Sequence, residues 1–400
     1  MIALQFRRSP ARYVAARALS RRAPGLVASH LAPLRLGHVG EPELPADGWV
    51  RVAPKLAGIC GSDLAMVAGD ASFYFGPLVS TPFVPGHEVV GTLVDPLDDL
   101  PSGTRVVIEP VLGCAARGLD PACRACAAGD TGCCENTASG HVAPGLQTGF
   151  CEDTGGGWGE VLVAHRSQIR PIPDDLPDES AVLVEPLACA VHAALRARVA
   201  DGDTVVVMGA GTIGLLTLAA IREFSSPGRV IAVAKHPRQR AEAARLGADD
   251  VVAAPSALRA VRLATGSLLH EPERGGGWLS SGSDVSLECT GSMAALDVCL
   301  RTTRPRGRVV LVGLPGAATI DLAPVWHREL ELTGAYTYGA EQQNGTRRNT
   351  FDMAIELAAK LDLESLVSAA YPLSRYPEAI DHAMDAGRLG AVKVVFDIAR

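Results

Sequence analysis

The chain has 400 residues, 48% hydrophobic and 20% charged, which is too long for one compact core and predicts two domains. Its net charge of −7 argues against a nucleic-acid partner, because binding to phosphates requires an excess of Lys and Arg. No apolar run approaches the roughly 20 residues that cross a bilayer, so we expect no membrane partner.

Short apolar segments broken by Gly and Pro occupy residues 1–178. We expect the first, residues 1–7, to be a strand and not a targeting segment, because no apolar core with a cleavage site follows it. Further strands are predicted at residues 50–53, 88–94 and 104–109. This pattern indicates a mainly β domain with long loops.

From residue 179 to 336 the pattern alternates between strands and helices, which predicts a parallel sheet with right-handed crossovers. The predicted strands are 204–208, 230–234, 285–288 and 308–313, and the predicted helices are 181–197, 212–223, 241–246 and 293–302. Residues 266–283, rich in Gly and Ser, are expected to form a solvated, flexible insertion. A helix at 349–361 and a strand at 392–398 lie in a last segment, 337–400, which is too small to fold alone and should complete the first domain.

A glycine-rich turn follows the strand 204–208 and opens the next helix: Gly209, Ala210, Gly211, Thr212, Ile213 and Gly214. In such a turn the first glycine allows the tight bend, the second lets the backbone approach a pyrophosphate, and the third allows close helix packing. The strand before it and the helix after it favour a dinucleotide site over a structural turn.

The end of the following strand bears on the choice of dinucleotide. An acidic residue that binds the ribose of NAD is expected there, but this chain has Ala234, followed by Lys235 and Arg240. Since cations attract a 2′-phosphate, NADP is favoured over NAD. The alternative is that these cations are solvated and that NAD binds through other contacts.

Five of the ten cysteines lie between Cys114 and Cys134. In a long chain, clustered cysteines bind metal more often than they form disulfides, and a reducing compartment, the cytoplasm, is expected. Four of them have spacing suited to a closed, structural zinc site in a lobe at about residues 110–136: Cys114, Cys123, Cys126 and Cys134.

A second, sparser cluster combines Cys60 with His87 and Glu88. A mixed set of thiolate, imidazole and carboxylate ligands can keep one zinc position open for substrate, whereas four thiolates close the site. The two clusters therefore suggest two zinc ions per chain, one catalytic and one structural.

In chain order, four segments resemble the zinc-dependent medium-chain dehydrogenases, the family of alcohol, sorbitol and threonine dehydrogenases. They are Cys60-Gly-Ser62-Asp63, Gly86-His87-Glu88, Glu185-Pro-Leu-Ala-Cys189 and the glycine-rich turn, and the segments ending in Gly291 and Pro315 extend the likeness. The resemblance implies an α/β protein with a GroES-like, mainly β catalytic domain (1–178 and 337–400), a Rossmann domain (179–336) and a catalytic zinc in the cleft between them.

The resemblance also implies roles for individual residues. Cys60, His87 and Glu185 would bind the catalytic zinc, with Glu88 as a competing ligand. Ser62 would accept the alcohol proton, and Asp63 would orient His87. Contacts to the cofactor are implied for Cys189, Thr290 and Gly313.

The chain departs from the family pattern at two positions. Where the family has its first structural thiol, this chain has Asp120, so either Cys114 or Asp120 supplies that ligand. The relay histidine of many relatives is replaced by Ala65. The choice of Cys134 over its neighbour Cys133 follows the family spacing. The aromatic loop at residues 71–75 is equally compatible with a substrate-pocket wall and with simple packing.

The leading hypothesis is a cytoplasmic, zinc-dependent oxidoreductase that transfers a hydride between a secondary alcohol or polyol, or the matching ketone, and NAD(P). Alternatives are a zinc-independent enone or quinone reductase of the same fold and a non-catalytic cofactor-binding relative. The family further suggests a homodimer or homotetramer.

Overall fold

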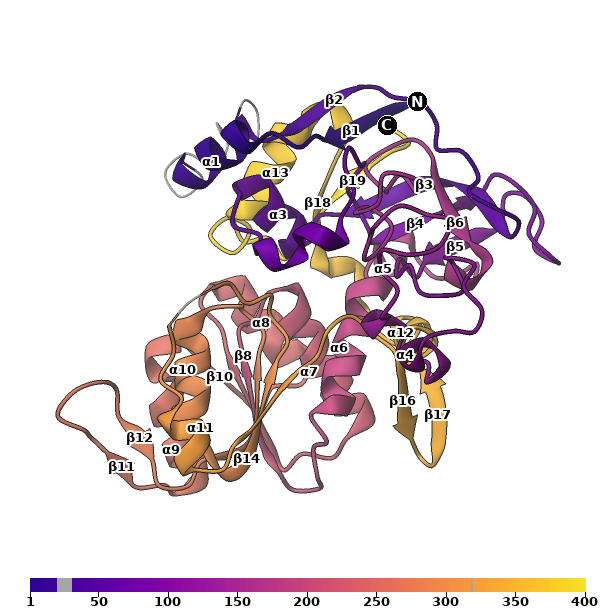
Figure 1. The fold of residues 1–400 in the computed structure, drawn as a ribbon. Coiled ribbons are helices and arrows are strands. Elements are labelled where there is room, and N and C mark those ends of the chain that lie inside the picture. Colours follow the sequence, from indigo (N-terminus) through magenta and orange to yellow (C-terminus); the bar gives the residue numbers. More distant parts are fainter. Residues whose placement is uncertain (20–30, 318) are drawn as a thin grey trace. The chain divides into compact units, whose positions relative to one another are not determined.

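The computed structural model describes residues 1–19, 31–317 and 319–400, which form two units (Figure 1). The first contains Met1–Glu185 and Phe351–Arg400, and the second contains Pro186–Thr350. The sequence pattern had suggested boundaries at 178/179 and 336/337. Both boundaries lie further along the chain, after Glu185 and after Thr350. The second is shifted because the hairpin of β16 (Ala340–Gln343) and β17 (Thr346–Asn349) joins the second unit, where Glu341 forms an ion pair with His192 at 2.8 Å.

The first unit is built on a mostly antiparallel sheet of seven strands, with the long strand β3 (Trp49–Gly58) at its centre. The path through the sheet is β18–β19–β3–β4–β5–β7, and β6 also pairs with β3. The other strands are β4 (Val89–Leu93), β5 (Arg105–Ile108), β6 (Leu162–His165), β7 (Ile169–Pro171), β18 (Val367–Tyr371) and β19 (Lys393–Asp397). The last segment of the chain thus completes this sheet.

The inward positions of this sheet alternate with outward ones, as expected for strands with one buried face. Val50 and Val52 of β3 are buried with Val106 and Ile108 of β5. The short helices of the unit lie in its connections: α3 (Gly61–Ala68), η2 (Phe73–Leu78), α4 (Arg124–Ala127), η3 (Thr131–Cys133), η4 (Arg166–Gln168), α5 (Asp178–Ala181), α12 (Thr350–Ala358), η6 (Glu364–Leu366), η7 (Leu373–Arg375) and α13 (Tyr376–Met384).

Helix α1 (Pro10–Leu19), like α3 and α13, occurs where strands and loops were expected. The opening strand β1 (Ile2–Phe6) pairs with β2 (Leu34–His38). The helix α1, which lies between these strands in the chain, packs against α3. Proline at the first helical position and four alanines favour this helix. The Tyr13 hydroxyl donates a hydrogen bond to the Ala71 carbonyl at 2.9 Å. In the aromatic loop that follows, Phe73 and Tyr74 are exposed.

The second unit contains a parallel six-stranded sheet in the order β10–β9–β8–β13–β14–β15. The strands are β8 (Thr204–Met208), β9 (Arg229–Val233), β10 (Asp250–Val252), β13 (Ser283–Glu288), β14 (Thr303–Leu311) and β15 (Glu331–Gly334). The helices are α7 (Thr212–Phe224), α8 (Pro237–Arg245), η5 (Ala254–Ser256), α9 (Ala257–Thr265), α10 (Met293–Thr302) and α11 (Ala323–His327), and α6 (Val184–Arg196) leads into the unit. Alternate residues Val206 and Met208 pack against α9 and α10. Val205 and Val207 are also fully buried, which is why β8 reads as a continuous apolar run.

Two predicted segments differ in detail. The expected helix at 181–197 consists of α5 and α6. Part of the expected flexible insertion forms a two-stranded hairpin, β11 (Leu269–His270) with β12 (Trp278–Leu279). Trp278 stacks on His270 with ring centroids 4.2 Å apart, and the buried Arg328 guanidinium lies 5.6 Å from the Trp278 ring, which orders this end of the insertion. Among the described residues, no helix is long and apolar enough to cross a membrane.

Candidate metal and cofactor sites

The thiol of Cys60 is held where β3 passes into α3. Cys60 is the N-cap of α3, with extended backbone angles, and its N–H donates a 3.0 Å hydrogen bond to the Asp63 carboxylate in the first turn of the helix. Asp63 is completely buried, and its other carboxylate oxygen lies 3.7 Å from His87 Nδ1. Burial raises the pKa of Asp63, against the opposing effects of His87 and the Cys60 N–H. Asp63 thus links the two halves of the cluster.

His87 and Glu88 immediately precede β4 and are both buried. The bend before them requires Gly86, whose φ is +96° and where a Cβ would lie 2.5 Å from the Trp158 ring. The candidate ligand atoms of Cys60, His87 and Glu88 all lie within 4.8 Å of one another. The structure therefore brings together three of the four residues that the sequence suggested for a catalytic zinc.

The fourth, Glu185, lies in the first turn of α6 and is outside that 4.8 Å group. It is nevertheless buried close to the same residues: burial raises its pKa to about 8, His87 opposes the rise, and Glu88 and Cys60 add to it. Cys60 likewise has a pKa raised to about 12, first by burial and then by Glu88. Thiolate and carboxylate charges crowded in this way are destabilised unless a cation joins them.

Three polar atoms in this cluster are buried without a hydrogen-bond partner among the described residues: Ser62 Oγ, Asp63 Oδ1 and His87 Nδ1. Buried polar atoms normally have partners, so their grouping beside the Cys60 thiol fits residues that bind a cation. The mixed sulfur, nitrogen and oxygen donors fit zinc with an open coordination position.

Lys393, at the start of β19, was not foreseen from the sequence. Its ammonium group forms a buried ion pair with the Glu88 carboxylate and donates a 3.1 Å hydrogen bond to the Ile59 carbonyl. Burial lowers the pKa of Lys393, but Glu88 and Cys60 outweigh this effect and raise the pKa overall. A Cβ at Gly58 would lie 1.8 Å from Glu88 Oε2, so only glycine fits beside this pair. The available sequence signal was a lysine directly before the apolar residues Val394, Val395 and Phe396 of the terminal strand.

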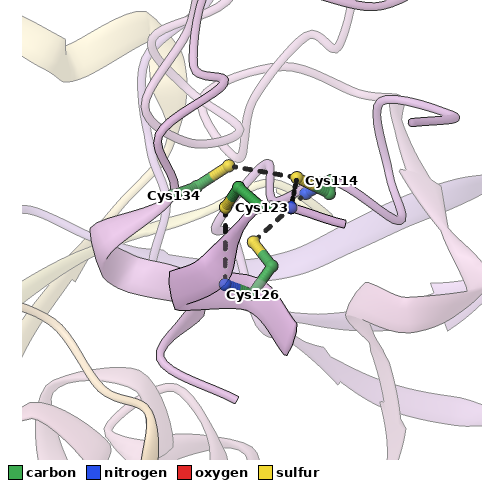
Figure 2. Close-up of side chains that lie close together, drawn as sticks. All are labelled: Cys114, Cys123, Cys126 and Cys134. Carbon is green, nitrogen blue, oxygen red and sulfur yellow. Dashed lines mark hydrogen bonds between the residues drawn. The ribbon is translucent and has the colours of Figure 1, made fainter. Parts of the chain in front are cut away.

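The four-cysteine lobe has a different geometry (Figure 2). The sulfur atoms of Cys114, Cys123, Cys126 and Cys134 lie within 4.8 Å of one another, and those of Cys114 and Cys134 are 3.7 Å apart. Asp120 and the exposed Cys133 are not part of this group. All four donors are thiols, so a zinc ion bound by them would have no open position.

Backbone N–H groups point at these sulfur atoms. Cys123 N donates to Cys114 Sγ at 3.3 Å, and Cys126 N donates to Cys123 Sγ at 3.4 Å. Burial opposes ionisation of Cys123, but the N–H groups of Cys126 and Glu135 outweigh it and lower the pKa of Cys123 to about 7. These N–H groups thus favour the thiolate form of Cys123. Burial raises the pKa of Cys126 and of Cys134, so a bound cation would be needed to hold these two as thiolates.

The fully buried Arg117 connects the loops of this lobe. It was not predicted from the sequence. Its guanidinium donates to five backbone carbonyls, those of Leu112, Ser139, Val142, Ala143 and Gly145. These contacts fix the loops of the lobe beside the apolar cluster that includes Leu112 and Val142, and a bound metal would order them further.

In the second unit the glycine-rich turn joins β8 to α7. Gly209 has a φ of +103°, which suits glycine, and a Cβ at Gly214 would lie 1.8 Å from the Gly209 carbonyl oxygen. Gly211 is the N-cap of α7, and a Cβ there would meet nothing within 4 Å. The backbone is therefore open at the N-terminus of α7, where a pyrophosphate fits. Ala210 is buried, and Thr212 and Ile213 form the first turn of the helix.

The remaining candidate cofactor residues lie after the strands β9, β13 and β14, in α8, or in α6. The guanidinium of Arg240 folds back onto the end of β9, with hydrogen bonds to the carbonyls of Ala234 (3.3 Å) and Lys235 (3.0 Å). A Cβ at Gly313 would lie 2.1 Å from Gly291 N, so the chain after β14 closely approaches the turn that contains Thr290. Cys189 is a half-buried residue of α6.

A parallel sheet that carries a glycine-rich turn, together with a separate unit that holds a mixed zinc-type cluster, defines an NAD(P)-dependent oxidoreductase of the alcohol dehydrogenase type. Comparisons agree: residues 46–174 match the alcohol dehydrogenase GroES-like domain, and residues 212–360 match the zinc-binding dehydrogenase domain. The chain therefore belongs to the zinc-dependent medium-chain dehydrogenase family, with a GroES-like domain and a Rossmann domain.

Individual relatives span nearly the whole chain. Sorbitol dehydrogenase of Arabidopsis thaliana is 30% identical over 94% of this chain and 93% of its own length. L-Idonate 5-dehydrogenase of Vitis vinifera is 29% identical, covering 87% and 88%. Among solved structures, a zinc-binding dehydrogenase from Sinorhizobium meliloti 1021, bound to NADP, is 26% identical with a TM-score of 0.70, covering 93% and 97%.

Proposed function

We propose that this protein is a two-zinc, NADP-dependent dehydrogenase of secondary alcohols or polyols. The observation that carries the proposal is the buried cluster of Cys60, His87 and Glu88, whose ligand atoms lie within 4.8 Å of one another. Its mixed donors distinguish it from the four-thiol lobe and suit a zinc ion that keeps a position for substrate. The sorbitol and L-idonate dehydrogenase relatives support a polyol substrate.

Cys60, His87 and Glu185 would hold the catalytic zinc, and Glu88 would stay paired with Lys393. Distance alone favours Glu88, but Lys393 already neutralises that carboxylate. A zinc ion would instead balance the charges of Cys60 and Glu185, which the structure crowds together in the buried pocket. We assign the structural zinc to the four thiols of the lobe, with Cys114 and not Asp120 as the first ligand.

A zinc ion held by these residues would supply a Lewis acid that lowers the pKa of an alcohol hydroxyl, and the bound cofactor would supply the hydride acceptor. Ser62, whose buried hydroxyl has no hydrogen-bond partner among the described residues, would accept the alcohol proton. Asp63 would hold the Cys60 N–H and orient His87. With Ala65 in place of a histidine, the proton would leave through water or the cofactor ribose.

The position of Arg240 supports NADP. Its guanidinium lies against the end of β9, and Lys235 is next to it, at the place where an NAD-binding chain has a carboxylate. The likeness to a solved NADP complex supports the same choice. Lys235→Ala should weaken NADP affinity several-fold and leave NAD affinity nearly unchanged. Equal effects on both cofactors would contradict the electrostatic argument.

Zinc content and turnover test the central proposal. The purified protein should contain about two zinc ions and oxidise a polyol with NADP, whereas Cys60→Ala should contain one and lose turnover while still binding cofactor. Cys133→Ala, a change at an exposed thiol outside both clusters, is the matched control and should keep both ions. A wild-type protein with only one zinc, held by the lobe, would refute the proposal.

Glu185→Gln tests the third ligand separately. It should lose the catalytic zinc and keep the structural one, since a neutral amide is a poor zinc ligand. Full retention of both ions would shift the assignment to Glu88.

Two further parts of the proposal concern context. A cytoplasmic location agrees with ten cysteines that are all free thiols, most of them buried or half-buried. Assembly as a homodimer or homotetramer follows from the family, and sedimentation of the purified protein tests it directly.

A further inference from the structure

Glu288, the last residue of β13, is a buried carboxylate that the proposed reaction does not use; it is 1% exposed. One carboxylate oxygen accepts a 2.8 Å hydrogen bond from Thr290 N and a second hydrogen bond from the Thr290 hydroxyl. The other accepts from Gly291 N at 2.9 Å. The Glu288 carboxylate accepts all three of these hydrogen bonds.

Among the described residues, no cation forms an ion pair with Glu288, although a buried carboxylate is normally paired with one. Three N–H and O–H donors face the carboxylate instead. The surroundings of Glu288 therefore favour a positive ligand.

The position of Glu288 in the sheet indicates which ligand this is. In the order β10–β9–β8–β13–β14–β15, the strand sequence reverses between β8 and β13, and a dinucleotide lies across the carboxyl ends at such a point. The glycine-rich turn would contact the pyrophosphate, and the end of β9 would contact the ribose of the adenosine half of the cofactor. The carboxyl end of β13, where Glu288 lies, then belongs to the nicotinamide side.

The segment that Glu288 holds also contacts the glycine-rich turn. A Cβ at Gly209 would lie 2.3 Å from Thr290 Cγ2, and one at Gly313 would lie 2.1 Å from Gly291 N. The turn at residues 289–292 therefore packs closely against Gly209 and Gly313, which both belong to the candidate cofactor site. Any shift of this turn changes the surface on which the cofactor rests.

We propose that Glu288 is a positioning residue that shapes the turn at 289–292 for the nicotinamide half of the cofactor, and that its uncompensated charge favours the oxidised, cationic nicotinamide. The inference rests on dinucleotide binding as part of the proposed function. It adds a specific consequence, which is that the balance between oxidised and reduced cofactor depends on one carboxylate.

Glu288→Gln removes the charge with little change in shape. The ratio of the NADP⁺ dissociation constant to that of NADPH should rise about tenfold, which corresponds to about 1.4 kcal/mol. Glu288→Asp keeps the charge but withdraws the carboxylate from the turn, so it should weaken both forms by a similar factor and leave the ratio unchanged. Glu273→Gln, an exposed carboxylate of the same unit, is the control and should change neither.

The measurements use the full-length, zinc-loaded protein, with calorimetry for NADP⁺, nicotinamide fluorescence for NADPH and a thermal melt for each variant. A Gln variant that weakens both forms equally, or an Asp variant that shifts the ratio as far as Gln does, overturns the charge assignment. An Asp variant with unchanged affinities overturns the positioning assignment, even where Gln fails to fold. A wild-type protein that binds neither NADP(H) nor NAD(H) refutes the proposed function instead.

Discussion

Replacement of Lys393 by methionine is a direct test of how the catalytic pocket is stabilised. Lys393 is 3% exposed and forms an ion pair with Glu88, so Lys393→Met preserves the apolar stem but leaves a buried carboxylate without its cation. Breaking a buried pair from one side typically costs about 3–5 kcal/mol. A cost of this size is a large part of the roughly 5–15 kcal/mol that stabilises a domain.

The matched double variant is Lys393→Met with Glu88→Gln, which removes both charges. Because the loss in the single variant comes from an unpaired charge and not from lost packing, the double variant should recover to within about 1–2 kcal/mol of the wild type. Bound zinc would offset part of the cost in the single variant, so the difference should be larger after chelation.

Urea unfolding with and without chelator measures these free energies, and zinc analysis of the same samples reports the occupancy of both sites. A single variant within about 1 kcal/mol of the wild type would refute the ion-pair argument. So would a double variant that recovers no stability. Loss of the catalytic zinc from an otherwise stable double variant would instead identify Glu88 as a direct ligand.

Three other changes test separate parts of the structure. Cys126→Ser should remove one zinc ion and expose the lobe to proteolysis, without loss of NADP binding. Gly214→Ala should weaken cofactor affinity at least tenfold, because the added Cβ would lie 1.8 Å from the Gly209 carbonyl oxygen; unchanged calorimetric affinity would contradict this. Although burial opposes it, Lys55 and Arg105 lower the pKa of Asp178, so its stabilising effect is present above the unfolded pKa and is lost as pH falls through the folded pKa. Asp178→Asn should therefore destabilise the protein at pH 7 but not at acid pH, as thermal melts at both pH values would reveal.

The features that the sequence predicted well are local ones. The glycine-rich turn and the thiols from Cys114 to Cys134 are each contained within a short stretch of chain, so residue spacing alone indicates which atoms can meet. Alternating strands and helices similarly predicted the parallel sheet, because each crossover unit is nearly continuous in sequence. The helix α1 was missed because its neighbours read as strands and loops.

The mixed metal cluster depended on the tertiary structure. Pairing of β19 with β3 sets Val395 opposite Gly58 and thereby brings Lys393 to Glu88, although these two residues are about three hundred positions apart. No periodicity or spacing encodes such a contact, since it arises from strand register within a sheet built from both ends of the chain. The sequence by itself determined the family, the two kinds of cysteine cluster and the cofactor turn. Only the folded structure decided which ionisable groups are buried together. The free energy of burying them depends on their depth and on their distance from one another, which residue type alone does not determine.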